Sequence, residues 1–181
     1  VKTTLTYDPV KELGDMPEFG VMFKFDADYN QVTWYGMGPE ETYVDRCKGA
    51  KLGIYKNKVE DNMAKYLVPQ ECGMHMDTEW VTVKRSTVLD NRNRHIEQSG
   101  LTFRAGSEIN HSTFAFSCLP YTAEELENAT HQEELPPERR TVLCIYGAVR
   151  GVGGIDSWGS DVEDDYRINA EKDIHYSFII R

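Results

Sequence analysis

A glycine-rich stretch near the end of the chain carries the side chain that is best suited to binding chemistry. The stretch is Gly151-Val-Gly-Gly-Ile-Asp-Ser-Trp-Gly-Ser160, and its four glycines permit positive φ angles or close approach to a neighbour. We therefore predict a loop that presents one large aromatic side chain, Trp158. An exposed indole suits stacking against a flat apolar surface, such as one face of a sugar ring. The alternative is that Trp158 closes the end of a hydrophobic core.

Other candidate groups give weaker signals. The acidic residues Asp161, Glu163, Asp164 and Asp165 could offer oxygen ligands to Ca²⁺, but they lack the spacing of an EF-hand, which favours a solvated acidic surface. The chain has five histidines, and no two of them have the i, i+4 spacing of a metal-binding helix. They are His75, His95, His111, His131 and His175. Motifs of serine hydrolases, phosphate-binding loops and dinucleotide-binding folds are absent. Any metal site would therefore have to be assembled by the fold, and the residues alone do not indicate an isolated enzyme.

A second distinctive run is Trp34-Tyr-Gly-Met-Gly-Pro-Glu-Glu-Thr-Tyr-Val-Asp-Arg46. It reads as the end of a strand followed by a turn at glycine and proline. The charged side chains of this turn could form ion pairs that anchor the loop, and they are Glu40, Glu41, Asp45 and Arg46. Contact with a substrate is the alternative, and structural anchoring is the favoured interpretation.

The composition is typical of a folded, acidic protein. Of its 181 residues, 40% are hydrophobic and 11% aromatic, which is enough for one packed domain over residues 1–181. The formal net charge of −10 argues against nucleic acid and against anionic membrane surfaces as partners. No apolar run approaches the roughly 20 residues that span a bilayer. The chain opens on a strand-like segment without an initiator Met, so we expect it to be cut from a longer chain.

Hydrophobic residues alternate with a period of two along most of the chain, which predicts strands. The predicted strands cover residues 2–7, 20–25, 31–35, 80–83, 95–97, 101–103, 111–118, 141–147 and 174–180. Asn91-Arg-Asn-Arg94 is predicted to be a hairpin tip. Many short strands separated by turn residues predict an all-β fold, either an antiparallel sandwich or a barrel.

One short helix is expected over residues 121–130. Thr122 is a suitable N-cap, and Glu125 three residues later completes a capping box. The prolines Pro136 and Pro137 prevent the helix from continuing.

The cysteines indicate a reducing compartment. No pair has the spacing of a zinc site or a redox motif, and the four are Cys47, Cys72, Cys118 and Cys144. We predict free thiols in a cytoplasmic protein.

Four motifs follow one another along the chain and carry a resemblance. They are the run at residues 34–46 (W-x-G-x-G-P-x-E-x-Y-x-D-R), Pro69-Gln-Glu-Cys-Gly73, the predicted helix at residues 121–131 (Y-[ST]-x-x-x-L-x-x-[AT]-x-H), and residues 151–158 (G-x-G-G-x-D-S-W). Together they resemble the C-terminal domain of large bacterial β-galactosidases, glycoside hydrolase family 2. The resemblance covers nearly the whole chain.

The resemblance implies an antiparallel β-sandwich of the galactose-mutarotase-like, or supersandwich, type, in agreement with the period of two. It also implies a truncated sandwich, because the family's domain begins upstream of this chain. An incomplete sandwich leaves an open edge strand that can pair with another copy, so a homo-oligomer is expected. The other implied partners are the remaining domains of the same enzyme, or a large subunit, and the β-galactoside substrate.

The resemblance places the chemistry in another domain. The family's two catalytic glutamates and its Mg²⁺ ligands lie in a TIM barrel that is absent here, and Na⁺ is a further ion of that barrel. No cofactor is therefore implied for this chain, and the isolated fragment is expected to be inactive. In the whole enzyme, two carboxyl groups about 5 Å apart would hydrolyse terminal β-D-galactosides such as lactose with retention. The resemblance implies that Trp158 reaches this active site and stacks on the aglycone sugar.

Two other functions stay open. One is a mutarotase-like aldose epimerase, which needs a Glu base and a His acid that converge in one cleft, and no epimerase motif surrounds the histidines. The other is a stand-alone carbohydrate-binding module. Upstream coding sequence, or a partner subunit that carries the barrel, would distinguish these possibilities.

Overall fold

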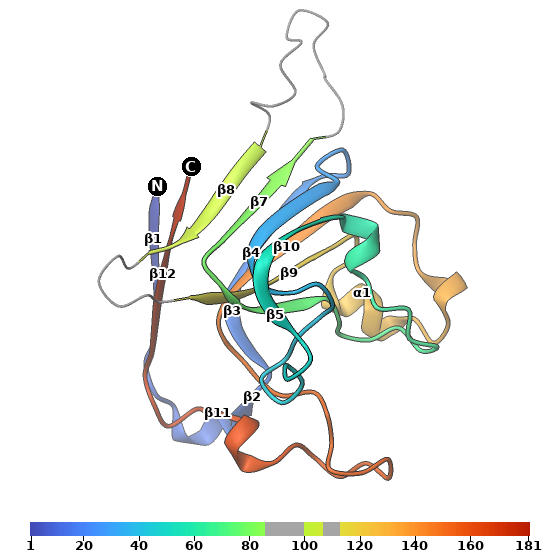
Figure 1. Cartoon of the computed structure of the whole chain (residues 1–181). Coiled ribbons are helices and arrows are strands. Elements are labelled where there is room, and N and C mark those ends of the chain that lie inside the picture. Colours follow the sequence, from blue (N-terminus) through green and yellow to red (C-terminus); the bar gives the residue numbers. More distant parts are fainter. Residues whose placement is uncertain (86–99, 107–112) are drawn as a thin grey trace, which may run out of the picture.

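Two antiparallel sheets form the fold in the computed structural model, which describes residues 1–85, 100–106 and 113–181 (Figure 1). The six-stranded sheet has the order β1 (Lys2–Tyr7), β12 (Ile174–Ile180), β8 (Gly100–Ala105), β7 (Trp80–Lys84), β4 (Gln31–Gly38) and β5 (Lys51–Lys58). The four-stranded sheet has the order β3 (Glu18–Asp26), β10 (Arg140–Val149), β9 (Phe114–Leu119) and β6 (Met74–Thr78). A short pair joins β2 (Asp15–Met16) to β11 (Ile168–Asn169).

Short helices connect these strands. The α-helix α1 (Ala123–Asn128) follows β9. The 3-10 helices are η1 (Lys11–Leu13), η2 (Val59–Asn62), η4 (Gln132–Glu134) and η5 (Asp164–Tyr166). The alternation of apolar residues along each strand directs one side-chain set between the two sheets. The main core therefore lies there, and its members include Val32, Trp34, Val81, Phe103, Phe116, Leu143, Ile145 and Phe178.

The middle strands of the four-stranded sheet are buried on both faces, whereas the edge strand β3 alternates and leaves Met22 46% exposed. All six residues of β9 are buried, as are six consecutive residues of β10. On the face turned away from the main core, Tyr43 is 0% exposed and packs over side chains of β6, β9 and β10 in a second apolar cluster. Beside it, Leu126 of α1 packs with Leu119, Cys72 and Tyr121. The segments that follow β4 and β9 thus cover this sheet.

The predicted all-β sandwich with one short helix is confirmed. Each predicted strand that lies within the described residues corresponds to an observed strand, whereas residues 91–94 and 95–97 and the start of the strand at 111–118 lie outside them. Two strands of the main sheets were missed, besides the two-residue strands β2 and β11. The edge strand β5 mixes lysine and glycine with its apolar residues, and β6 is a short segment directly after Gly73, so neither shows a clear period of two.

The predicted capping box is also confirmed, although α1 is shorter than expected. Thr122 Oγ1 accepts a hydrogen bond from the Glu125 amide at 3.2 Å, and the Glu125 carboxylate accepts one from the Thr122 amide at 2.9 Å. The Thr122 amide is the main cause that lowers the pKa of Glu125. These two bonds satisfy donors that a helix N-terminus otherwise leaves unpaired.

The four cysteines are free thiols, and Cys72, Cys118 and Cys144 are buried. Among the described residues, no helix combines the length and the apolar character that crossing a membrane requires.

We expect Thr122→Ala to lower the free energy of unfolding by about 1 kcal/mol, because the Glu125 amide loses its acceptor. Urea denaturation measures this loss. Glu127→Ala is the matched control, since Glu127 is exposed in the same helix. An equal effect of both substitutions on the free energy of unfolding would show that the capping box does not stabilise the fold.

Candidate functional site

The Trp158 side chain points into solvent and is 91% exposed. It does not close the end of the core, so that alternative is wrong. The predicted backbone role of the glycines is observed at two positions of the loop. Gly159 has a φ of +93°, and a Cβ on Gly154 would lie 2.3 Å from the carbonyl oxygen of Ser160. Side chains other than hydrogen would strain the loop at both positions.

The Asp156 carboxylate organises the tip of this loop. It accepts hydrogen bonds from the Ser160 hydroxyl at 2.7 Å, the Trp158 amide at 2.8 Å and the Ser160 amide at 3.3 Å. The Ser160 hydroxyl, followed by the Trp158 amide, holds the pKa of Asp156 below its usual range. Asp156 therefore fixes the backbone on both sides of Trp158 and directs the indole outward.

The base of the loop is attached to a distant part of the chain. Asp45 Oδ2 accepts a hydrogen bond from the Gly153 amide at 2.7 Å. The Gly151 amide donates to the carbonyl of Tyr166 at 2.8 Å, and a Cβ at Gly151 would lie 2.7 Å from Asp45 Oδ2. Two of the motifs that the sequence singles out therefore meet at Asp45. Sequence reasoning missed this contact, although both partners lie in those motifs.

Ion pairs hold the segments on either side of the loop. Arg150 pairs with Asp15 at 2.7 Å and also with Asp161. Arg167 pairs with Asp161 at 3.2 Å and with Asp164 at 3.6 Å. The acidic residues after the loop are exposed, in agreement with the favoured interpretation. Within the described ranges, no group of three His, Cys, Asp or Glu side chains could hold a metal ion.

The charged residues of the run at 34–46 form the predicted anchor only in part. Glu41 pairs with Arg46, and its second oxygen accepts the Gly73 amide at 2.7 Å. Asp45 instead accepts a backbone amide, and Glu40 is exposed at the rim. The prediction of one four-member ion-pair set was therefore wrong. Charge pairing and amide binding are indistinguishable in a sequence, because a carboxylate serves both.

An open pocket lies between this anchor and the base of the loop. Pro39, Arg46, Lys48 and Tyr166 are among the residues that line it. Because Asp45 also lines it, the contact that holds the loop lies at the wall of the pocket. The pocket thus places charged groups at the base of the Trp158 loop.

His75 on β6 lies at the edge of the main core. Its ring is 2% exposed, stacks on Phe116 at 5.1 Å between centroids and lies tilted against Trp34 at 4.2 Å. Burial lowers the pKa of His75 to about 4. Nδ1 lies 3.3 Å from the Met37 carbonyl, which can only accept, so Nδ1 carries the proton of the neutral ring. His75 shares a pocket with Glu40 and Glu41, but a neutral ring does not serve as the acid that an epimerase needs.

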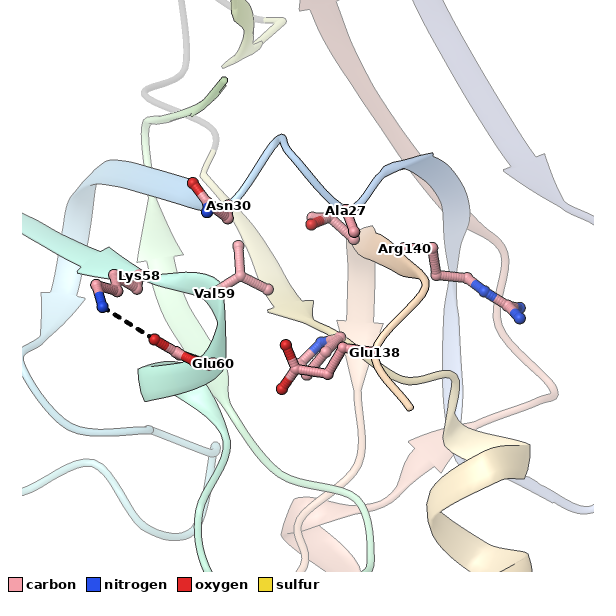
Figure 2. A pocket seen from close by; sticks show the side chains of 9 residues that line it. Ala27, Asn30, Lys58, Val59, Glu60, Glu138 and Arg140 are labelled. Carbon is pink, nitrogen blue, oxygen red and sulfur yellow. Dashed lines mark hydrogen bonds and ion pairs between the residues drawn. The ribbon is translucent and has the colours of Figure 1, made fainter. Parts of the chain in front are cut away.

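A further small pocket lies at the opposite end of β10 (Figure 2). Lys58 and Glu60 pair across its rim at 3.1 Å, and Arg140 points away from it (Figure 2). Its lining includes Asn30 and Glu138 but no aromatic ring. It therefore lacks the flat apolar surface that sugar stacking requires, which leaves the Trp158 loop as the stronger candidate.

Comparison with known proteins agrees with the resemblance. The model of the beta galactosidase small chain family matches residues 1–180. The chain belongs to this family. It is 48% identical over 180 residues to the beta-galactosidase small subunit of Latilactobacillus sakei, which covers 99% of the chain and 55% of that protein. It is 42% identical to a beta-galactosidase of Halalkalibacterium halodurans (93% of the chain, 15% of that protein) and 38% identical to one of Streptococcus thermophilus (98% and 16%).

The chain therefore spans about half the length of that small subunit and a much smaller share of the two longer enzymes. Its described residues supply an exposed aromatic loop and an open pocket at the base of that loop. They do not bring together an acid, a base and a nucleophile around Trp158.

We expect Asp45→Ala to raise the hydrogen-exchange rate of the Gly153 amide by about tenfold, because that amide loses a charged acceptor. Exchange measured by NMR at single amides tests this. Glu40→Ala, which removes an exposed carboxylate from the same motif, should leave the rate unchanged. Unaltered exchange in Asp45→Ala would mean that Asp45 does not hold the loop.

We expect His75 to make stability depend on pH. Its folded pKa of about 4 lies below the unfolded value of 6.5, so the unfolded chain binds the proton more readily between these values. The stabilisation by neutral His75 is complete above about pH 6.5 and is lost as the pH falls towards 4. The stability difference between wild type and His75→Gln should shrink by about 3 kcal/mol from pH 7 to pH 4.

Urea unfolding at a series of pH values measures this difference. His175→Gln controls for the loss of an exposed imidazole, because His175 lies on the surface. A difference between wild type and His75→Gln that stays constant with pH would contradict a buried neutral His75.

Proposed function

We propose that this chain is the C-terminal part of a β-galactosidase of glycoside hydrolase family 2, with the galactose-mutarotase-like type of sandwich. The whole enzyme hydrolyses terminal β-D-galactosides such as lactose with retention of configuration. The chain contributes binding to that reaction, and its partner is the rest of the enzyme, either on the same chain or as a large subunit. The free thiols suit a cytoplasmic enzyme.

The exposed Trp158 is the observation that carries the proposal. An indole that is 91% exposed keeps a large apolar surface in water, which is unfavourable unless a partner covers it. Asp45 and Asp156 hold the loop on a rigid support, so the ring is presented with little loss of conformational freedom on binding. We assign Trp158 to stacking on the aglycone sugar. This sugar is the leaving group in hydrolysis and the acceptor in galactosyl transfer.

The proposed chemistry belongs to groups outside this chain. The two catalytic glutamates, Mg²⁺ and Na⁺ would all lie in the barrel domain, so we assign no catalytic residue, metal ligand or cofactor here. The family match and the β-galactosidase relatives support this division, since the chain corresponds to about half of a small subunit. We also propose that the complete enzyme is a homo-oligomer.

The two other functions have less support. An epimerase requires a histidine that can donate a proton, and the buried ring of His75 is neutral at physiological pH. A stand-alone carbohydrate-binding module would use the same Trp158 surface but would bind sugars without the barrel. That module stays the second candidate, because the loop geometry suits it equally well.

We expect Trp158→Ala in the complete enzyme to weaken the use of glucose as an acceptor by about tenfold, because the stacking surface is lost. The first cleavage step should slow far less, since Trp158 touches no reacting bond. Rates of galactosyl transfer and of nitrophenol release from nitrophenyl β-galactoside measure the two steps. Trp158→Phe, which retains a flat ring, should use glucose as an acceptor less well than the wild type but better than Trp158→Ala. Equal losses in both steps would contradict the stacking role.

The isolated chain separates the two candidate functions. We expect it to release no nitrophenol from nitrophenyl β-galactoside, and clear turnover would overturn the assignment of the chemistry to another domain. Tight binding of galactosides or glucose to the isolated chain, lost in Trp158→Ala, would favour the stand-alone module.

A further inference from the structure

The outward face of the six-stranded sheet has an unusual composition. Cross-strand register aligns the side chains Ile54, Tyr35, Trp80, Arg104, Ile179 and Lys2 in a single row across all six strands. Leu52 and Met37 form the adjacent row at one end. On the other side, Lys56, Thr33, Thr82 and Thr102 form the next row. We call these three rows the outer face.

Charge on this sheet surface is of one sign. Around the outer face, Lys58 and Lys84 both register with Gln31. The outward positions of the six strands therefore include five cations, namely Lys2, Lys56, Lys58, Lys84 and Arg104. None of these outward positions is Asp or Glu, although the chain has 30 acidic residues and a net charge of −10. Lys58 already pairs with Glu60 at 3.1 Å, which leaves four cations for a partner.

Large apolar side chains on the outer face remain accessible. Leu52 is 54% exposed and Ile54 is 68% exposed, while Tyr35 and Trp80 are partly exposed. Among the described residues, no helix covers this sheet, and α1 packs instead beside the four-stranded sheet (Figure 1). Trp, Tyr and Arg in one row are the residue types that dominate the binding energy of protein interfaces.

We propose that the outer face is a docking surface for an acidic polypeptide surface that belongs to the rest of the enzyme. Trp80 and Tyr35 would form its apolar centre, and Arg104, Lys84, Lys56 and Lys2 would pair with carboxylates of the partner. This surface is separate from the Trp158 loop. The inference rests on the proposed function only for the identity of the partner, because the chemistry of the partner follows from the outer face itself.

Charge complementarity selects this occupant over two others. A two-fold dimer through the outer face would place four cations of one copy against the same four of the next, which is repulsive. A nucleic acid would meet the long-range field of a chain with a net charge of −10, and exposed Leu52 and Ile54 offer it no specific contact. A protein surface with a local group of carboxylates around an apolar centre matches both the charge and the apolar row.

Hydroxyl-radical footprinting of the complete enzyme, purified with every subunit it has, tests the proposal. We expect Trp80 and Tyr35 to be protected in wild type. In the double variant Lys84→Glu, Arg104→Glu, oxidation of both rings should rise by about tenfold, because two favourable contacts become repulsive. The double variant Lys11→Glu, Lys172→Glu is the control, since it makes the same charge change at exposed residues outside the outer face. Carbodiimide, which joins amines to touching carboxylates, should link Lys56 or Lys84 to the rest of the enzyme.

Each outcome decides the question. Rapid oxidation of Trp80 in the wild-type enzyme, with no carbodiimide link, overturns the proposal. A carbodiimide link that joins two copies of this chain through Lys56 or Lys84 assigns the outer face to a second copy, and protection removed by nuclease assigns it to nucleic acid. Either result overturns the proposal. Circular dichroism confirms that the variants fold. Neither footprinting nor cross-linking measures turnover. A complete enzyme without β-galactosidase activity would therefore contradict the proposed function, while the docking test would remain valid.

Discussion

Burial of both faces of β9 and β10, the middle strands of the four-stranded sheet, is the constraint on which the rest of the structure depends. One face meets the six-stranded sheet, so the other face needs a separate cover. Tyr43, fully buried against Met74, Val142 and Val149, supplies part of that cover. Because Asp45 follows Tyr43 by two residues, this packing brings its carboxylate to the loop that leaves β10. The position of Trp158 therefore depends on apolar packing beneath it.

The two sheets differ in what they leave for partners. The four-stranded sheet is covered by the segments after β4 and β9, whereas the six-stranded sheet keeps aromatic, apolar and cationic side chains on its surface. The two proposed binding surfaces, the Trp158 loop and the outer face, thus lie at separate places.

The sequence predicts those features that depend on local patterns. The strand of residues 174–180 alternates clearly, and the capping box of Thr122 and Glu125 lies within four residues. Contacts between distant segments are not predictable in this way. Nothing local indicates that Asp45 accepts the Gly153 amide 108 residues away, or that the ring of His75 packs against Trp34. Likewise, the outer face appears only when the register aligns residues from six strands.

A crystal structure of the complete enzyme with a leaving-group sugar bound tests the role of Trp158 most directly. We predict that the indole of Trp158 lies parallel to one face of that sugar, about 4 Å away, with the Gly153 amide still bonded to Asp45. An indole that remains in solvent, or that packs only against protein while the sugar is bound elsewhere, would contradict the central claim that this loop is presented to an active site.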